Sequence, residues 1–249
     1  MKKVSNKGFT LVELLVVIGI LGILMGALFP AISSAMVKAN LSACGMRGRN
    51  LFVAITAANT EREALGLGNV WPKTQAEENA DAATDPLSGG VSSAQDYFTY
   101  LFDMQNISDT TKWKPYISGV DISVLSGAGG PASPNGATKI DAKNCLWNVT
   151  ANITDEIPDV YPVLFSRNLP ASQLQSYATT YDGGSQELTL GKTGGATYDT
   201  PFGNKAFVLI RKGGGVITQT AKYALTSVMF NKQPYSIEAE NPPQFLEAK

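Results

Sequence analysis

The sequence predicts an α+β protein in which one long helix lies on an antiparallel sheet. Two observations carry this prediction. An uncharged run over residues 14–37 is followed by apolar residues at alternating spacings of four and three, which is the pattern of one helix face. Beyond about residue 66, short apolar segments alternate with turn residues, which is typical of strands.

The apolar run is long enough to cross a membrane. It contains 24 consecutive uncharged residues over residues 14–37, and at ~1.5 Å per residue such a helix spans the ~30 Å core of a bilayer. Residues 1–8 hold Lys2, Lys3 and Lys7 and no acid, and a cluster of this kind keeps its end of a membrane helix in the cytoplasm. We therefore expect a single membrane pass with a cytoplasmic N-terminus.

Two other export signals match parts of the same region. Ser33-Ser34-Ala35 offers a small-x-small site for a secretory peptidase, and Leu41-Ser42-Ala43-Cys44 is similar to the box before a lipidated cysteine. However, the apolar run is longer than the about 7–15 residues of a secretory signal, and it carries the carboxylate of Glu13 near its start. The box before Cys44 lies beyond Lys38, apart from the apolar run. A retained membrane helix accounts better for these features.

A carboxylate inside a membrane segment is costly and usually has a partner. Residues 7–14, Lys7-Gly8-Phe9-Thr10-Leu11-Val12-Glu13-Leu14, resemble the class III signal of type IV prepilins and type II secretion pseudopilins. In that family a membrane peptidase cuts after the glycine and methylates the new N-terminal residue. The resemblance implies cleavage between Gly8 and Phe9, N-methylation of Phe9, and an assembly role for Glu13. Pro30 stands where the family often has a helix-kinking proline.

A fibre would also explain the buried charge in physical terms. Cleavage after Gly8 creates an ammonium group at the membrane boundary, and Glu13 of a neighbouring subunit can neutralise it away from water. Each charge is then paired only in the assembled fibre. Gly22 and Gly26 form a small-xxx-small pair that permits close helix contact, with ordinary membrane-helix glycine content as the alternative.

The helix is expected to continue beyond the membrane and to pack on the rest of the chain. Gly66 and Gly68 supply a stop. Arg47 and Arg49 lie off the apolar stripe, and we expect them on a solvated face because an acidic chain is a poor nucleic-acid binder. The stripe itself comprises Val37, Leu41, Cys44, Gly48, Leu51, Ile55 and Ala58.

The remaining residues predict a head of short elements. We expect a helix over 94–105 and a loop over 125–136. The glycines of Lys212-Gly213-Gly214-Gly215 predict a hairpin turn, since the spacing and following helix of a phosphate loop are absent. Strands are expected at residues 146–149, 161–166, 187–190, 206–211 and 216–220.

The composition excludes several kinds of site. The chain has 249 residues, a net charge of −1 and no histidine, which rules out Ser-His-Asp and Cys-His nucleophile pairs and every histidine-ligated metal. We expect no enzymatic activity. Cys44 and Cys145 are too few for a disulfide scaffold or a four-thiolate zinc site. In an oxidising compartment they could form one bridge, and two buried thiols are the alternative.

One further resemblance concerns calcium. Residues 199–207 are loosely similar to an Asp-Pro-Trp-Gly segment of major pseudopilins, which carry a calcium ion in a C-terminal loop. The resemblance implies Asp182 and Asp199 as candidate oxygen ligands. Because no Asp-x-Asp-x-Asp spacing is present, turn-forming aspartates are the alternative. No other cofactor is expected.

Together these features predict a structural subunit of a helical, pilus-like filament, type IV pilin-like in fold. We expect a cleaved leader (1–8), a membrane and assembly helix (9–37), its amphipathic continuation (38–65) and a globular head (66–249). A type II secretion pseudopilin is favoured over a type IV pilin for adhesion, motility or DNA uptake. A membrane-anchored binding domain or enzyme is the rival of another class. Expected partners are the prepilin peptidase, other subunits and an inner-membrane assembly platform, with no nucleic acid; the head would lie in the periplasm of a bacterium.

Overall fold

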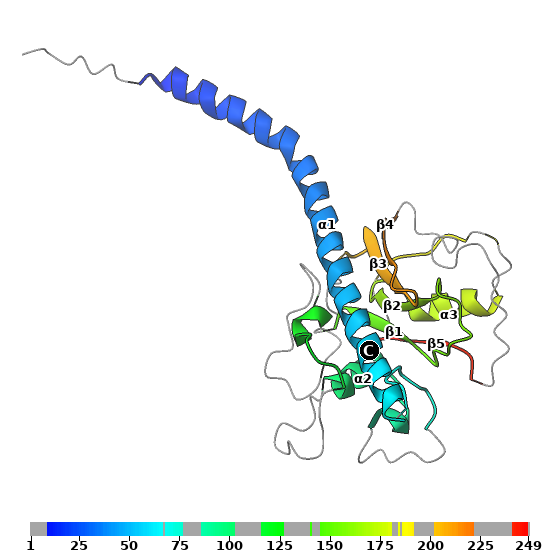
Figure 1. Cartoon of the computed structure of the whole chain (residues 1–249). Helices are drawn as coiled ribbons and strands as arrows, with labels where there is room; N and C mark the ends of the chain where they lie inside the picture. The colour runs from blue at the N-terminus through cyan, green and yellow to red at the C-terminus, as the bar shows by residue number, and fades with distance from the viewer. Residues whose placement is uncertain are drawn as a thin grey trace, which may run out of the picture. The chain divides into compact units, whose positions relative to one another are not determined.

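The computed structural model describes residues 9–66, 68–76, 86–102, 116–126, 140, 145–180, 184, 186–191, 202–221 and 241–248. One long helix, α1 (Leu11–Ala64), comes first, and a five-stranded antiparallel sheet follows it (Figure 1). This arrangement is the predicted α+β fold, and it fits a pilin-like protein. Residue contacts divide the chain into two units, Met1–Ala39 and Asn40–Lys249.

The sheet has the strand order β4-β3-β2-β1-β5, and every neighbouring pair is antiparallel. β1 and β2 are buried at every position, and β3 is buried except at its last residue. β2 and β3 accordingly are apolar runs, whereas β1 alternates apolar residues with the buried polar residues Asn148 and Thr150. The five strands are β1 (Trp147–Ala151), β2 (Pro162–Ser166), β3 (Ala206–Arg211), β4 (Val216–Thr220) and β5 (Gln244–Leu246).

Within the second unit, α1 packs closely on this sheet. A Cβ added at Gly48 would lie 2.5 Å from Trp147 Cη2, and one added at Gly45 would lie 2.9 Å from Val216 Cγ1. The two glycines therefore let the helix backbone approach the strands. The predicted stripe is confirmed as this seam at its six residues from Leu41 onward, whereas Val37 belongs to the first unit. The buried positions of α1 are Leu41, Cys44, Gly45, Gly48, Leu51, Phe52, Ala54, Ile55 and Ala58.

Several predicted boundaries are confirmed. Gly66 has φ +69° and donates its N–H to the carbonyl of Glu63 at 3.0 Å, so the helix stops where a left-handed residue follows it. The turn over 212–215 joins β3 to β4 as a hairpin, with Gly214 at φ +75°. α2 (Ala94–Leu101) covers most of the helix expected over 94–105, and Ser93 caps it by accepting the N–H of Asp96 at 3.2 Å.

Other predictions of secondary structure are wrong or incomplete. Residues 187–190 do not form a strand; Thr189 donates its N–H to Gln173 Oε1 at 3.2 Å, and Tyr177 Oη donates to the carbonyl of Glu187 at 3.2 Å. Side chains of α3 (Ala171–Thr180), a helix that was not predicted, thus take the place of a partner strand. The 3-10 turns η1 (Pro86–Gly89) and η2 (Ile122–Leu125) complete the described elements. Of the loop expected over 125–136, residues 127–136 lie outside the described residues.

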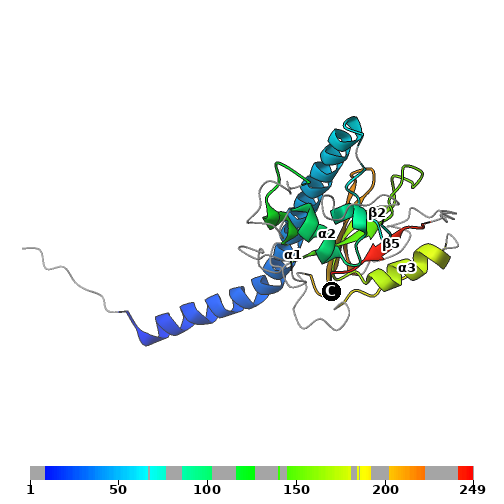
Figure 2. The ribbon, with the colours of Figure 1, turned by 90° about the horizontal axis from the view of Figure 1, so that it is seen from below.

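The edge strand β5 comes from the end of the chain and was not predicted. It pairs with β1 through Thr150↔Phe245 and is extended by the Ala248 N–H, which donates to the buried Asn148 Oδ1 at 2.9 Å. α3 lies beside β5 in both views (Figures 1 and 2). Three residues are too few for a periodic pattern, so tertiary partners define this strand.

Candidate functional site

The start of α1 is organised by a reciprocal pair of side chains. Thr10 precedes the first helical residue, and its Oγ1 accepts the N–H of Glu13 at 3.3 Å. In return Glu13 Oε2 accepts the Thr10 N–H at 2.9 Å and the Thr10 hydroxyl at 2.7 Å. This is a capping box, in which two backbone N–H groups at a helix start are satisfied by each other's side chains. Sequence reasoning missed Thr10, although the Thr-x-x-Glu spacing signals it.

The capping box leaves half of the carboxylate available. Both hydrogen bonds to the Glu13 side chain reach Oε2, and Oε1 has no partner within the part of the chain that the structure describes. The side chain is exposed along with its neighbours. One carboxylate can therefore hold the helix start with one oxygen and meet a cation with the other.

The apolar side chains around Glu13 are uncovered. Every residue from Phe9 to Met36 is exposed, whereas soluble monomers rarely expose apolar patches of more than a few hundred Å². Among the described residues, α1 is the one helix long and apolar enough to cross a membrane. Gly19, Gly22 and Gly26 face open space, with no atom within 4 Å of an added Cβ. This surface needs a bilayer or other helices to cover it.

Pro30 lies inside α1, and the helix continues on both sides of it. A proline inside a helix removes one backbone donor, yet α1 stays helical around this position. The kink stays a prediction. Gly8 lies outside the described residues, so the structure places the candidate cleavage site only from its Phe9 side.

Residues 3–29 match the model of the prokaryotic N-terminal methylation motif. The chain carries the N-terminal signal of the type IV pilin-like family. The matched range includes Gly8, Phe9 and Glu13, and the motif implies a prepilin peptidase substrate that works with pilin-type subunits. The pilin-like signal and the α+β fold are those of structural proteins rather than of enzymes. No curated protein and no solved structure matches this chain.

The two cysteines are buried, and the structure has them as free thiols rather than as a bridge. Cys145 Sγ donates to the carbonyl of Trp147 at 3.2 Å. Burial raises the pKa of the Cys145 thiol to about 12, against smaller lowering effects of the Trp147 hydrogen bond and the charge of Arg167. Because the thiolate is the reactive form, this side chain should react slowly in the native protein.

Alkylation can distinguish free thiols from a bridge. In the native protein at pH 8 we expect no labelling of Cys44 or Cys145 by iodoacetamide, since both side chains are fully buried. In denaturant without reductant, two labels per chain are expected, counted by intact mass. No label until a reductant is added would instead show the Cys44–Cys145 disulfide. Label in the native state would contradict the burial.

The structure does not test the two candidate calcium ligands. Asp182 and Asp199 lie outside the described residues, and among the described ones no group of three or more potential metal ligands converges.

The expectation for the arginines needs one correction. Arg49 is exposed, but Arg47 is half-buried and donates to the carbonyl of Ser126 at 2.6 Å, so it belongs to the packing of the head.

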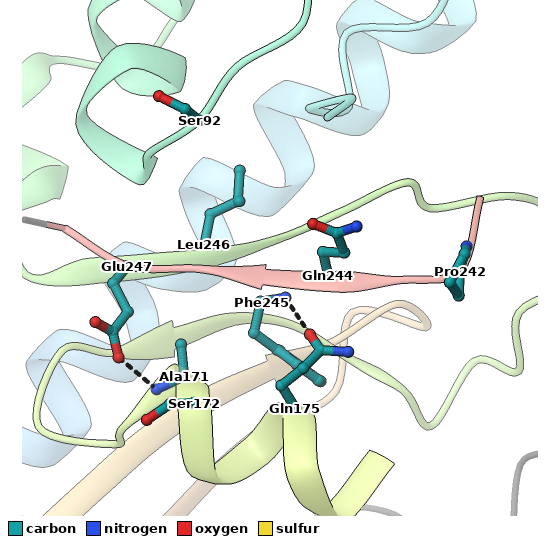
Figure 3. A pocket seen from close by; sticks show the side chains of 9 residues that line it. All are labelled: Ser92, Ala171, Ser172, Gln175, Pro242, Gln244, Phe245, Leu246 and Glu247. Carbon is teal, nitrogen blue, oxygen red and sulfur yellow. Dashed lines mark hydrogen bonds between the residues drawn. The ribbon is translucent and has the colours of Figure 1, made fainter. Parts of the chain in front are cut away.

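A groove of about 450 Å³ follows the outer edge of β5 (Figure 3). Gln175 of α3 accepts the Phe245 N–H at 2.9 Å and donates to the carbonyl of Pro243 at 3.2 Å. Glu247 Oε1 accepts the Ala171 N–H at 3.0 Å. The primary amide of Gln175 thus occupies the backbone groups that an added strand would need. The edge is protected against pairing with another chain.

Proposed function

We propose that this protein is a structural subunit of a helical, pilus-like filament. The observation that carries the proposal is the half-free carboxylate of Glu13, five residues after the candidate cleavage site, within an exposed apolar helix. After cleavage, the Phe9 ammonium of one subunit pairs with Glu13 Oε1 of a neighbour, and the apolar helices cover one another. Contacts of this head-to-tail kind do not close and generate a fibre.

The proposed arrangement in the cell follows from the charges. Lys2, Lys3 and Lys7 keep the leader in the bacterial cytoplasm, where the prepilin peptidase cuts it. Residues 9–37 then span the inner membrane, residues 38–65 continue the helix, and residues 66–249 form the periplasmic head. An inner-membrane assembly platform extracts the processed subunit into the growing fibre.

Processing is tested by the intact mass of the protein from its native membrane. We expect loss of residues 1–8, which leaves 249 − 8 = 241 residues, with one added methyl group on Phe9. Gly8→Val should block cleavage and leave the full chain in the membrane. A mature protein that begins at Met36 or at a lipidated Cys44 would contradict the proposal.

Within the family we favour a type II secretion pseudopilin over a type IV pilin. The support is the size of the head, well above one hundred residues beyond α1, which suits a specialised subunit. Deletion of the gene should then abolish secretion of folded proteins from the periplasm and leave twitching motility and DNA uptake unchanged. The reverse result would assign the protein to type IV pili.

A further inference from the structure

A second pocket, of about 420 Å³, lies at the C-terminal end of α1, within the second unit. Segments far apart in the sequence line this pocket. α1 contributes Asn59 and Glu63, the segment after α1 contributes Asn69 and Trp71, the loop after β1 contributes Asp155, and the β3–β4 turn contributes Lys212. The filament function proposed above uses none of these residues.

Internal hydrogen bonds hold the walls of the pocket in place. Asn59 Oδ1 accepts the Val70 N–H at 2.7 Å and so ties α1 to the segment that follows it. Lys212 Nζ donates to the carbonyls of Asp155 and Ile157 at 2.9 and 2.7 Å and so ties the β3–β4 turn to the loop after β1. A preformed pocket of this kind loses less conformational entropy on binding.

The indole of Trp71 forms an apolar wall. The ring packs against that of Phe52, with centroids 6.0 Å apart and planes tilted by 40°. The side chain is half-buried, so part of it stays accessible from the pocket. An aromatic ring that is fixed on one side and open on the other is a surface on which a flat apolar group can stack.

The polar groups around this ring include both donors and acceptors. Asn59 Nδ2, the Asn69 amide and the carboxylates of Glu63 and Asp155 have no hydrogen-bond partner within the described residues. Primary amides donate and accept, while ionised carboxylates only accept. Glu63, Asn69 and Asp155 are exposed to water, so a ligand that displaces this water should offer hydroxyl-like groups, each able to donate and accept, beside an apolar face.

We propose that this pocket binds a neutral saccharide. The C–H face of a sugar ring stacks on Trp71, and adjacent hydroxyl groups donate to the carboxylates of Glu63 and Asp155 and accept from the amides. The charges favour a neutral ligand. Two carboxylates repel an anion, and the Lys212 ammonium, fixed by two carbonyls in the same pocket, offsets one of the two negative charges that would attract a cation.

Saturation-transfer difference NMR on the full mature chain tests the proposal. The chain is held in an amine-oxide detergent, because a detergent with a sugar headgroup would compete for the site. The probes are methyl glucoside, methyl galactoside, maltose and chitobiose, with glucuronate as the anionic probe and choline as the cationic one. We expect saturation of ring C–H protons in at least one neutral sugar and none in glucuronate or choline.

Matched variants locate the binding. Trp71→Leu removes the stacking surface, and the exposed Asn69→Ala removes an amide without touching the core; each should weaken binding at least tenfold. Asn59→Asp keeps the acceptor for the Val70 N–H but replaces the pocket's amide donor with a second acceptor, and should weaken binding similarly. Gln244→Ala, at an exposed position of β5 outside this pocket, should leave the affinity unchanged.

Three results would overturn the proposal. One is the absence of binding by every neutral sugar probe. Another is binding that persists undiminished in both Trp71→Leu and Asn69→Ala, which would place the sugar elsewhere. The third is selective binding of choline that disappears in Glu63→Gln, which would identify a cation site instead.

Discussion

Replacement of Glu13 by Ala is expected to abolish fibre assembly and to leave the earlier steps intact. The variant removes a charge from the apolar segment, so it should insert in the membrane at least as well and still be cut after Gly8. Without the carboxylate, the Phe9 ammonium of an incoming subunit enters the fibre unpaired, and breaking one side of a buried ion pair costs ~3–5 kcal/mol. That penalty recurs at every subunit. Shearing and cross-linking should recover processed monomer with little fibre.

The capping box makes a sharper version of this experiment available. Glu13→Gln keeps an amide oxygen that can accept the Thr10 N–H, because Gln serves as well as Glu in a capping box, but it removes the charge. Thr10→Val keeps the charge of Glu13 but removes the hydroxyl that caps the Glu13 N–H, which destabilises the helix start by about 1 kcal/mol. If charge pairing drives assembly, Glu13→Gln should fail like Glu13→Ala, whereas Thr10→Val should still form fibres. Normal assembly of Glu13→Gln at native expression levels would exclude the charge-pairing mechanism.

Gly48→Ala should destabilise the head more than the same substitution at any other glycine of α1. The new Cβ would lie 2.5 Å from Trp147 Cη2 and 3.0 Å from Ile210 Cδ1. Trp147 cannot retreat readily, since it is fully buried and its Nε1 donates to the carbonyl of Val124 at 2.9 Å. Overpacking of this kind costs ~1–3 kcal/mol, against which the better helix propensity of alanine returns up to ~1 kcal/mol.

Urea unfolding followed by tryptophan fluorescence measures this effect. Gly19→Ala is the matched control: it makes the same helical substitution where no atom lies within 4 Å of the new Cβ. We expect a lower midpoint for Gly48→Ala and an unchanged or higher midpoint for Gly19→Ala, because only the gain in helix propensity applies there. Equal midpoints would show that α1 does not pack on β1 and β3 as closely as the structure has it.

Strands β1 to β4 and the seam of α1 were predictable because each shows a local pattern of apolar and turn residues in the sequence. β2 and β3 are apolar runs bounded by turn residues, β1 has its apolar residues at alternate positions, and the hairpin between β3 and β4 needs Gly214, whose φ is +75°. Residues 187–190 show the same kind of local pattern, but they do not form a strand. Gln173 and Tyr177 of α3 bond to two of its backbone groups, and these partners lie sixteen and ten positions away along the chain.

The functional residues also fall into those that the sequence predicts and those that it does not. Gly8, Phe9 and Glu13 could be found from the sequence because they stand at fixed distances from one another within one short segment. The methylation motif over residues 3–29 is likewise one continuous segment. The saccharide pocket could not be found from the sequence, because Asn59, Trp71, Asp155 and Lys212 belong to four separate segments. Nothing in their spacing brings them together.

The sequence by itself determined the long helix, its apolar first half, its processing signal and the α+β class of the head, because each depends on interactions within a few residues of one another. Only the tertiary structure decided which side chains close the edge of β5 and where a polar pocket forms. These features depend on contacts between distant segments, such as Gln175 with Phe245. Periodicity carries no information about such contacts, since it records which face of an element is buried but not what covers it.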